Sequence, residues 1–183
     1  MSIQRRIIAG TIVALLLQAL ALGAMVAKHA YALRSGATLV LKAAPVDPRH
    51  LLLGHYLVLR FPISSADRRF AAETGAVHNQ VVYAALEQTQ DGAWKIAGLH
   101  TAMPPFSPKR PVLRALLRRE SPQDRLVYGI ERYYLDERAA KAMEQRVRDG
   151  EVQLEVAVSR STGRAAIRRI LVNGKPVYQD PLF

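Results

Sequence analysis

Cysteine is absent from the 183-residue chain, which excludes a disulfide framework, a thiolate metal site and a lipid-bearing cysteine. The chain also lacks the Gly-x-Ser-x-Gly, Ser-x-x-Lys, P-loop and Gly-x-Gly-x-x-Gly motifs, so no serine nucleophile, phosphate cradle or dinucleotide site is indicated. Aromatic residues make up only 7% of the chain and do not alternate with basic residues, as a platform for single-stranded nucleic acid would require. These absences leave no positive argument for catalysis, for a cofactor or for nucleic acid as a partner.

Charge is missing altogether from residues 7–27, IIAGTIVALLLQALALGAMVA, where Thr11 and Gln18 are the strongest polar interruptions. About 20 apolar residues span a bilayer as a helix, and a cleaved signal usually has an apolar run of only about 7–15. A buried core helix would show a polar face, and this run shows almost none. We therefore predict a transmembrane signal-anchor helix. The alternatives are a buried core helix and a cleaved signal peptide, the latter because KHA before Tyr31 resembles a cleavage site.

The flanking charges predict the orientation of this helix. Arg5, Arg6 and the terminal amine precede it, while Lys28 and Arg34 follow it, so a small positive-inside bias places the N-terminus in the cytoplasm. The predicted organisation is a short cytoplasmic tail (1–6), a single pass through the inner (cytoplasmic) membrane (7–27) and an external or periplasmic β-rich domain (31–183).

The external domain is strongly basic. The chain has a net charge of +11, and the only charged side chains before residue 28 are Arg5 and Arg6, so the remainder carries +9. The basic residues are scattered rather than gathered in one stripe, which is more typical of a surface above an anionic membrane than of a nucleic-acid cleft. Anionic lipid headgroups are therefore one predicted partner.

Alternation of apolar and polar residues predicts a mainly antiparallel β domain. Asp91-Gly92 and Asn173-Gly174 each predict a tight hairpin turn, whereas the four prolines of 103–111 predict a loop. The predicted extended segments are 36–42, 54–63, 79–88, 93–100, 125–135, 152–159 and 165–178.

Two segments have helical signals. Residues 136–150 place acids first and end at Gly150, and residues 64–75 have Ser65 as the cap and Gly75 at the end. The predicted fold class is α+β, with one or two helices on an antiparallel β domain that follows the N-terminal transmembrane helix.

The segment VDPRHLLLGHYLVLRF, residues 46–61, joins a turn to an alternating strand. Asp47-Pro48 sets the turn, and Gly54 supplies a backbone conformation or a close approach that a side chain would forbid. Tyr56, Leu59 and Phe61 are expected to pack in or beside the core. We interpret the segment as mainly structural, with a binding role near His55 and Arg60 as the alternative.

These residues resemble the signature of the GDYXXLXY family of bacterial membrane-anchored proteins. VYGIERYYLDE (127–137) and RRILVNGKPV (168–177) resemble two later segments of the same family. The signature departs from the family pattern at His55, where an aspartate is expected, and at Phe61, where a tyrosine is expected. The matching signature positions are Asp47, Pro48, Arg49, Leu51, Leu52, Gly54, Tyr56 and Leu59.

A weaker resemblance is to signal peptidase I, and it extends only to the scaffold. The catalytic residues are missing. None of Pro45, Val46 and Asp47 provides a hydroxyl nucleophile before Pro48, and the basic residues near the closing turn are the arginines Arg168 and Arg169. Arginine keeps its proton and cannot activate a serine.

Candidate binding residues follow from the signature and from the segment ERYYL. Ordinary strand packing accounts for the tyrosines of this region, and the alternative predicts that Tyr128, Arg132 and Tyr134 form an exposed aromatic–cation strip for a protein or glycan partner. The five histidines show no metal-ligand spacing, so no metal site is predicted. The binding candidates are Gly54, His55, Tyr56, Arg60, Glu131, Tyr133 and Tyr134, and the structural candidates are Pro45, Asp47, Pro48, Leu59, Phe61, Asn173 and Gly174.

The family resemblance implies a partner, because members are often encoded beside multi-pass membrane proteins or joined to them. The expected function is that of a non-enzymatic, membrane-anchored accessory protein of the cell envelope. The alternatives are an envelope hydrolase or protease-like enzyme with an unrecognised site, and a basic domain that docks on anionic lipid.

Overall fold

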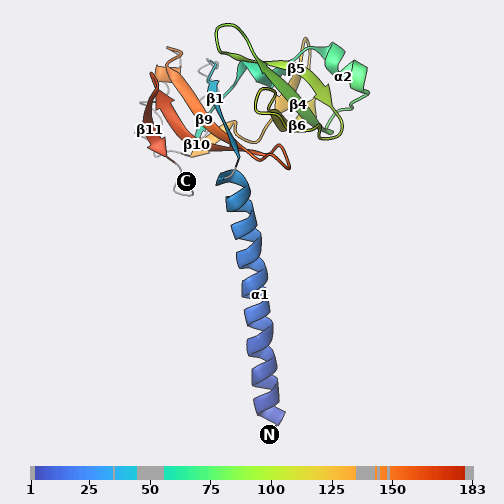
Figure 1. Ribbon diagram of the computed structural model, residues 1–183, viewed down its shortest axis with the longest axis vertical. Coiled ribbons are helices and arrows are strands. Elements are labelled where there is room, and N and C mark those ends of the chain that lie inside the picture. Colours follow the sequence, from blue (N-terminus) through green and yellow to red (C-terminus); the bar gives the residue numbers. More distant parts are fainter. Residues whose placement is uncertain are drawn as a thin grey trace.

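The computed structural model describes residues 3–34, 36–44, 56–134, 143, 145–147 and 149–179. Helix α1 (Ile3–Arg34) is a long rod that projects away from a β-rich domain (Figure 1). Within these described residues, no helix meets the combined length and hydropathy of a membrane-crossing segment. The span expected at 7–27 therefore stays a prediction.

The described strands of the β domain form two sheets and a short extra pair, and all strand neighbours are antiparallel. One sheet has the order β1-β9-β10-β11, with β1 (Ala37–Lys42), β9 (Val152–Val158), β10 (Ala165–Val172) and β11 (Lys175–Gln179). The other has the order β3-β7-β6-β4-β5, with β3 (Ser65–Ala66), β7 (Asp124–Val127), β6 (Val112–Arg118), β4 (Val81–Gln88) and β5 (Trp94–His100). The extra pair is β2 (Tyr56–Val58) with β8 (Arg132–Tyr134).

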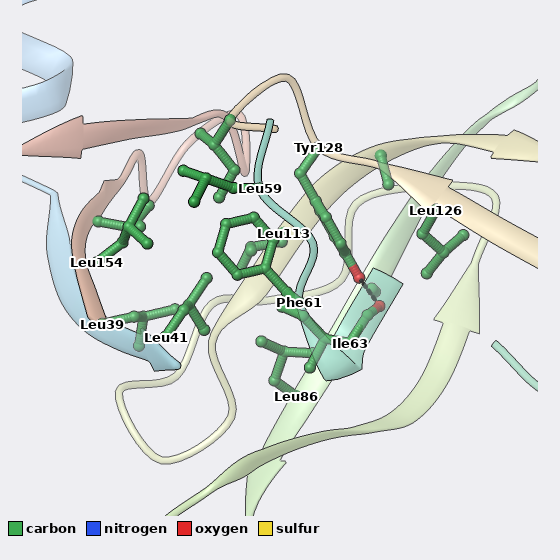
Figure 2. Packing of buried hydrophobic residues seen from close by; sticks show 14 of the residues in the cluster. Leu39, Leu41, Leu59, Phe61, Ile63, Leu86, Leu113, Leu126, Tyr128 and Leu154 are labelled. Carbon is green, nitrogen blue, oxygen red and sulfur yellow. Dashed lines mark hydrogen bonds between the residues drawn. The ribbon is translucent and has the colours of Figure 1, made fainter. Parts of the chain in front are cut away.

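One hydrophobic core lies between the two sheets. Leu39 and Leu41 reach it from β1, whereas Leu86 of β4 and Leu113 of β6 reach it from the five-stranded sheet. Phe61 is 2% exposed, and Figure 2 shows its ring between these two groups of leucines. The end of the signature segment therefore joins the two sheets through their shared core.

Several sequence predictions are confirmed. The fold is mainly antiparallel β, and the two predicted hairpins form at β4–β5 and at β10–β11. Asn173 and Gly174 have φ values of 50° and 77°, as a tight Asn-Gly turn requires. Helix α2 (Arg68–Thr74) ends at Gly75, which has φ of 65°.

The predicted cap of α2 is wrong. Ser65 belongs to β3, and Asp67 is the N-cap, because its carboxylate accepts the N–H of Arg69 at 2.9 Å. The short 3-10 helix η2 (Pro62–Ser64) separates this region from the signature strand, so extended structure does not run through to residue 63. Of the second predicted helix, 136–150, Met143 and residues 145–147 are described as helical, and Gly150 follows with φ of 71°.

Two strand predictions also need correction. The single strand predicted at 125–135 is replaced, within the described residues, by β7 and β8, because Gly129 adopts φ of 85° and turns the chain between them. Strand β6 is central in its sheet, yet the sequence analysis predicts no strand there.

The turn between β9 and β10 packs against the other sheet. The N–H of Arg114 on β6 donates to the carbonyl of Gly163 at 2.8 Å, and the N–H of Gly163 donates to the carbonyl of Ser159 at 2.8 Å. Gly163 has φ of 67°, and a Cβ placed on it would lie 3.0 Å from the Arg114 nitrogen. This turn is therefore a backbone contact between the two sheets that a side chain would disturb.

Candidate functional site

The two segments that carry the family-like motifs are neighbours in the fold. Tyr56 of β2 lies opposite Tyr134 of β8, and Val58 lies opposite Arg132. The N–H of Leu59 continues the pairing by donating to the carbonyl of Glu131 at 2.8 Å. The signature strand and the ERYYL segment thus form one unit.

The predicted site residues differ in where they lie. Arg60 is exposed, Leu59 and Phe61 are buried, and Tyr133 is partly buried against the core. The backbones of Tyr56 and Tyr134 are described, whereas their side chains are outside the described part of the chain. Also outside the described residues are Pro45, Asp47, Pro48, Gly54 and His55.

Glu131 holds the turn between β7 and β8. Its Oε1 accepts the N–H of Tyr128 at 2.5 Å, and its Oε2 accepts the N–H of Gly129 at 2.8 Å. The residue is only 8% exposed, so these bonds offset the cost of burying its charge. The carboxylate predicted to bind a partner is therefore engaged by the backbone of its own turn.

Tyr128 does not belong to an exposed strip, and that prediction is wrong. It is 6% exposed, and its hydroxyl donates to the carbonyl of Ile63 at 2.7 Å (Figure 2). The two-residue period from Tyr128 to Arg132 is broken by the turn at Gly129. Burial, followed by the negative charge of Glu131, raises the pKa of Tyr128 above its ordinary value.

We expect Tyr128→Phe to reduce the free energy of unfolding by about 1–2 kcal/mol near pH 8, because the buried Ile63 carbonyl loses its donor. The loss should shrink as the pH rises. The folded state keeps the Tyr128 hydroxyl protonated, whereas in the unfolded chain this hydroxyl loses its proton near pH 10. Deprotonation therefore favours the unfolded state of the wild type, and the variant, which has no hydroxyl at this position, is not affected. The two proteins should be about equally stable near pH 11.

Urea unfolding followed by the fluorescence of Trp94, the chain's only tryptophan, measures this difference. Tyr83→Phe, on β4, is the matched control for removal of a hydroxyl. A stability difference that stays constant from pH 8 to pH 11 would contradict the assignment.

Asp124 is a second buried acid, on the core-facing side of β7. It is 0% exposed, and within the described residues neither carboxylate oxygen accepts a hydrogen bond. Each oxygen is approached by a different arginine, with Arg68 Nε at 3.9 Å from Oδ1 and Arg119 Nη1 at 3.8 Å from Oδ2. Arg119 also donates to the carbonyl of Ala76 at 2.7 Å, which fixes its position beside the carboxylate.

We expect Arg119→Met to destabilise the protein by about 2–3 kcal/mol, because it removes that hydrogen bond and leaves Asp124 with one distant cation. Combining it with Asp124→Asn should cost at least about 1 kcal/mol less than the sum of the two single variants. Arg69→Met is the control, because Arg69 pairs with exposed Asp67 and should change stability by less than about 0.5 kcal/mol. Additive effects in urea unfolding would show that Arg119 and Asp124 do not interact.

Two concave regions adjoin these elements. A groove of about 520 Å³ runs along β1 from Thr38 to Lys42 and is closed on the other side by the β4–β5 turn and Trp94. A cleft of about 560 Å³ lies beside the Glu131 turn, and its lining includes one arginine from each of β6, β7 and β8 together with the acids Glu120 and Glu131. Both volumes are in the range that accepts small organic ligands.

Metal ligands do not gather in the described part of the chain. There, no group of three or more His, Asp or Glu side chains lies close enough together to hold a metal ion.

Comparison with known proteins identifies the family. No curated protein and no solved structure matches the chain. A family model described as GDYXXLXY protein matches residues 18–170, which include part of α1 and most of the β domain. The chain belongs to the GDYXXLXY family. In this GDYXXLXY protein, Leu59 and Phe61 of the signature are core residues, exposed by 0% and 2%.

The sequence analysis misses the burial of Asp124 and the pairing of Arg118 with Arg125 in this GDYXXLXY protein. The register places Arg118 directly opposite Arg125 across the β6–β7 hairpin. The signal for this hairpin was the turn-rich Glu-Ser-Pro-Gln-Asp sequence between two apolar segments. Without a predicted β6, the facing positions could not be aligned.

Proposed function

We propose that this protein is a non-enzymatic, membrane-anchored accessory protein of the bacterial cell envelope. Residues 7–27 cross the inner membrane, residues 1–6 are cytoplasmic and the β domain lies on the external or periplasmic side. The β domain binds a partner, which we take to be a multi-pass membrane protein.

The observation that carries this proposal is the exposed apolar surface of α1. The uncharged run 7–27 lies wholly within this helix, and at 1.5 Å per residue it is about 30 Å long, which is the thickness of a bilayer core. Its described large apolar side chains, from Ile8 to Met25, are each 52% to 73% exposed. Continuous apolar surface of this kind is normally covered by lipid or by a partner.

The accessory role is supported by the family and by the charge of the β domain. GDYXXLXY membership favours a multi-pass membrane protein as the partner, as the sequence resemblance implies. The net charge of +9 outside residues 1–27 favours an acidic partner face or anionic headgroups at the membrane surface.

The test is co-purification from native membranes. The full chain, tagged at its C-terminus, is extracted in mild detergent, and the proteins that accompany it are identified and quantified. A chain that begins at residue 36 is the control. We expect a multi-pass membrane protein in stoichiometric amount with the full chain. Recovery of the full chain without such a protein would contradict the accessory role, and it would favour an enzyme or docking on anionic lipid.

A further inference from the structure

Two arginines face each other on the outer side of the five-stranded sheet. Arg118 of β6 lies directly opposite Arg125 of β7 in the strand register. The next pair, Leu117 and Leu126, is fully buried in the core, so the arginine pair points to the opposite face. Like charges at directly opposed positions destabilise a sheet, which makes this pair costly unless an anion lies nearby.

The guanidinium groups of Arg118 and Arg125 use few of their donors within the described part of the chain. Arg118 donates one of its N–H groups to the side-chain oxygen of Asn79. Arg125 is partly buried, and within the described residues its guanidinium has neither a hydrogen bond nor an ion pair. Each guanidinium has five N–H donors, so several donors of this pair remain for a ligand.

The pair lies in the cleft of about 560 Å³ described above, whose volume exceeds that of a single inorganic anion. Glu131 lines it, but both of its oxygens already accept backbone N–H groups. His78 also lines it, and its Nδ1 accepts the N–H of Arg119 at 3.1 Å, so a neutral His78 carries its proton on Nε2 as a further donor. The polar lining consists of His78, Arg118, Glu120, Arg125, Glu131 and Arg132.

We propose that this cleft binds a phosphate monoester, whose terminal oxygens accept hydrogen bonds from Arg118 and Arg125. A terminal phosphate offers three unesterified oxygens, which can engage two facing guanidinium groups at once, whereas a carboxylate offers two. The rest of the ligand occupies the remaining volume, beside Glu120 and Val127. The ligand is either a lipid headgroup or a soluble phosphate ester, and the proposal does not depend on the accessory function.

Calorimetric titration of the full chain in detergent micelles with glycerol 3-phosphate is the first arm of the test, with glycerol as the reference. We expect saturable binding of glycerol 3-phosphate alone, and Arg125→Gln or Arg118→Gln should weaken it at least tenfold. Arg114→Gln is the matched control, because it removes the same charge from the same face of β6 outside the cleft. Trp94 fluorescence in urea confirms that each variant is folded.

The second arm distinguishes the two sources of the phosphate. The same titration is repeated in mixed micelles that contain phosphatidic acid, a monoester, or phosphatidylglycerol, an anionic diester. If the ligand is a lipid headgroup, phosphatidic acid competes for the cleft, so glycerol 3-phosphate binds more weakly in micelles with phosphatidic acid but not in those with phosphatidylglycerol. If the ligand is a soluble ester, glycerol 3-phosphate binds equally well in both kinds of micelle. The proposal is overturned if glycerol 3-phosphate does not bind, or if Arg114→Gln weakens binding as much as Arg125→Gln does.

Discussion

Gly163→Ala should destabilise the protein by about 2–4 kcal/mol, because two costs add at one position. A φ of 67° strains any residue that carries a Cβ. The new Cβ would also lie 3.0 Å from the Arg114 nitrogen and 3.2 Å from the Val112 oxygen, both backbone atoms of β6. Relief of this contact requires the β9–β10 turn to move away from β6, which stretches the hydrogen bond from Arg114 to Gly163.

Gly174→Ala is the matched control for this prediction. Gly174 has φ of 77° in the β10–β11 turn, and nothing lies within 4 Å of the position that its Cβ would take. We expect this variant to lose only about 1 kcal/mol, from backbone strain alone. Urea unfolding followed by Trp94 fluorescence compares the two, and equal losses would show that the contact between the sheets at Gly163 does not contribute.

Glu131→Ala should lower the free energy of unfolding by about 3–4 kcal/mol. The change leaves the N–H groups of Tyr128 and Gly129 without the acceptors that they have in the wild type. Glu131→Gln keeps one carbonyl oxygen and the shape of the side chain, so we expect a loss of only about 1–2 kcal/mol.

Glu120→Ala provides the control for removal of a carboxylate from the same cleft. Glu120 is exposed, and its loss should change stability by less than about 0.5 kcal/mol. If Glu131→Ala were as mild as Glu120→Ala, the turn between β7 and β8 would not depend on this carboxylate.

The parts of the fold that could be predicted are those with local signals. The β10–β11 hairpin combines an Asn-Gly turn with alternating flanks, and the β4–β5 hairpin does the same with Asp-Gly. The end of α2 at Gly75 is equally local, because only the left-handed conformation of one residue is involved.

Strand β6 could not be predicted in this way. Its sequence, VLRALLR, consists largely of good helix formers and has no strict alternation. Its strand conformation comes from pairing with β4 on one side and β7 on the other, which are contacts between distant parts of the sequence. The facing arginines and the burial of Asp124 depend on that pairing, so they could not be predicted either.

The Glu131 turn shows why the internal hydrogen bonds of Tyr128 and Glu131 could not be predicted from the sequence. Tyr128 and Glu131 have the polar groups of binding residues, and alternation alone places Tyr128 on the same face as Arg132 and Tyr134. The structure uses the polar groups internally, since the hydroxyl of Tyr128 bonds to Ile63 and the carboxylate of Glu131 bonds to the turn. A sequence cannot show whether such a group finds its partner within the chain.

The central claim is that α1 attaches the protein to the membrane. The most direct test introduces charged residues into α1 and measures how much of the protein stays with membranes that are washed at alkaline pH. The double variant Leu16→Arg with Leu20→Arg changes two side chains that are 64% and 70% exposed. If α1 were surrounded by water, it would accept both arginines at little cost. In a bilayer core each arginine costs about 2.5–3.5 kcal/mol. Val77→Arg, at a residue of the β domain that is 62% exposed, is the control. The expected result is that wild type and Val77→Arg stay in the washed membranes while the double variant leaves them. Retention of all three, or release of the wild type, would contradict the claim.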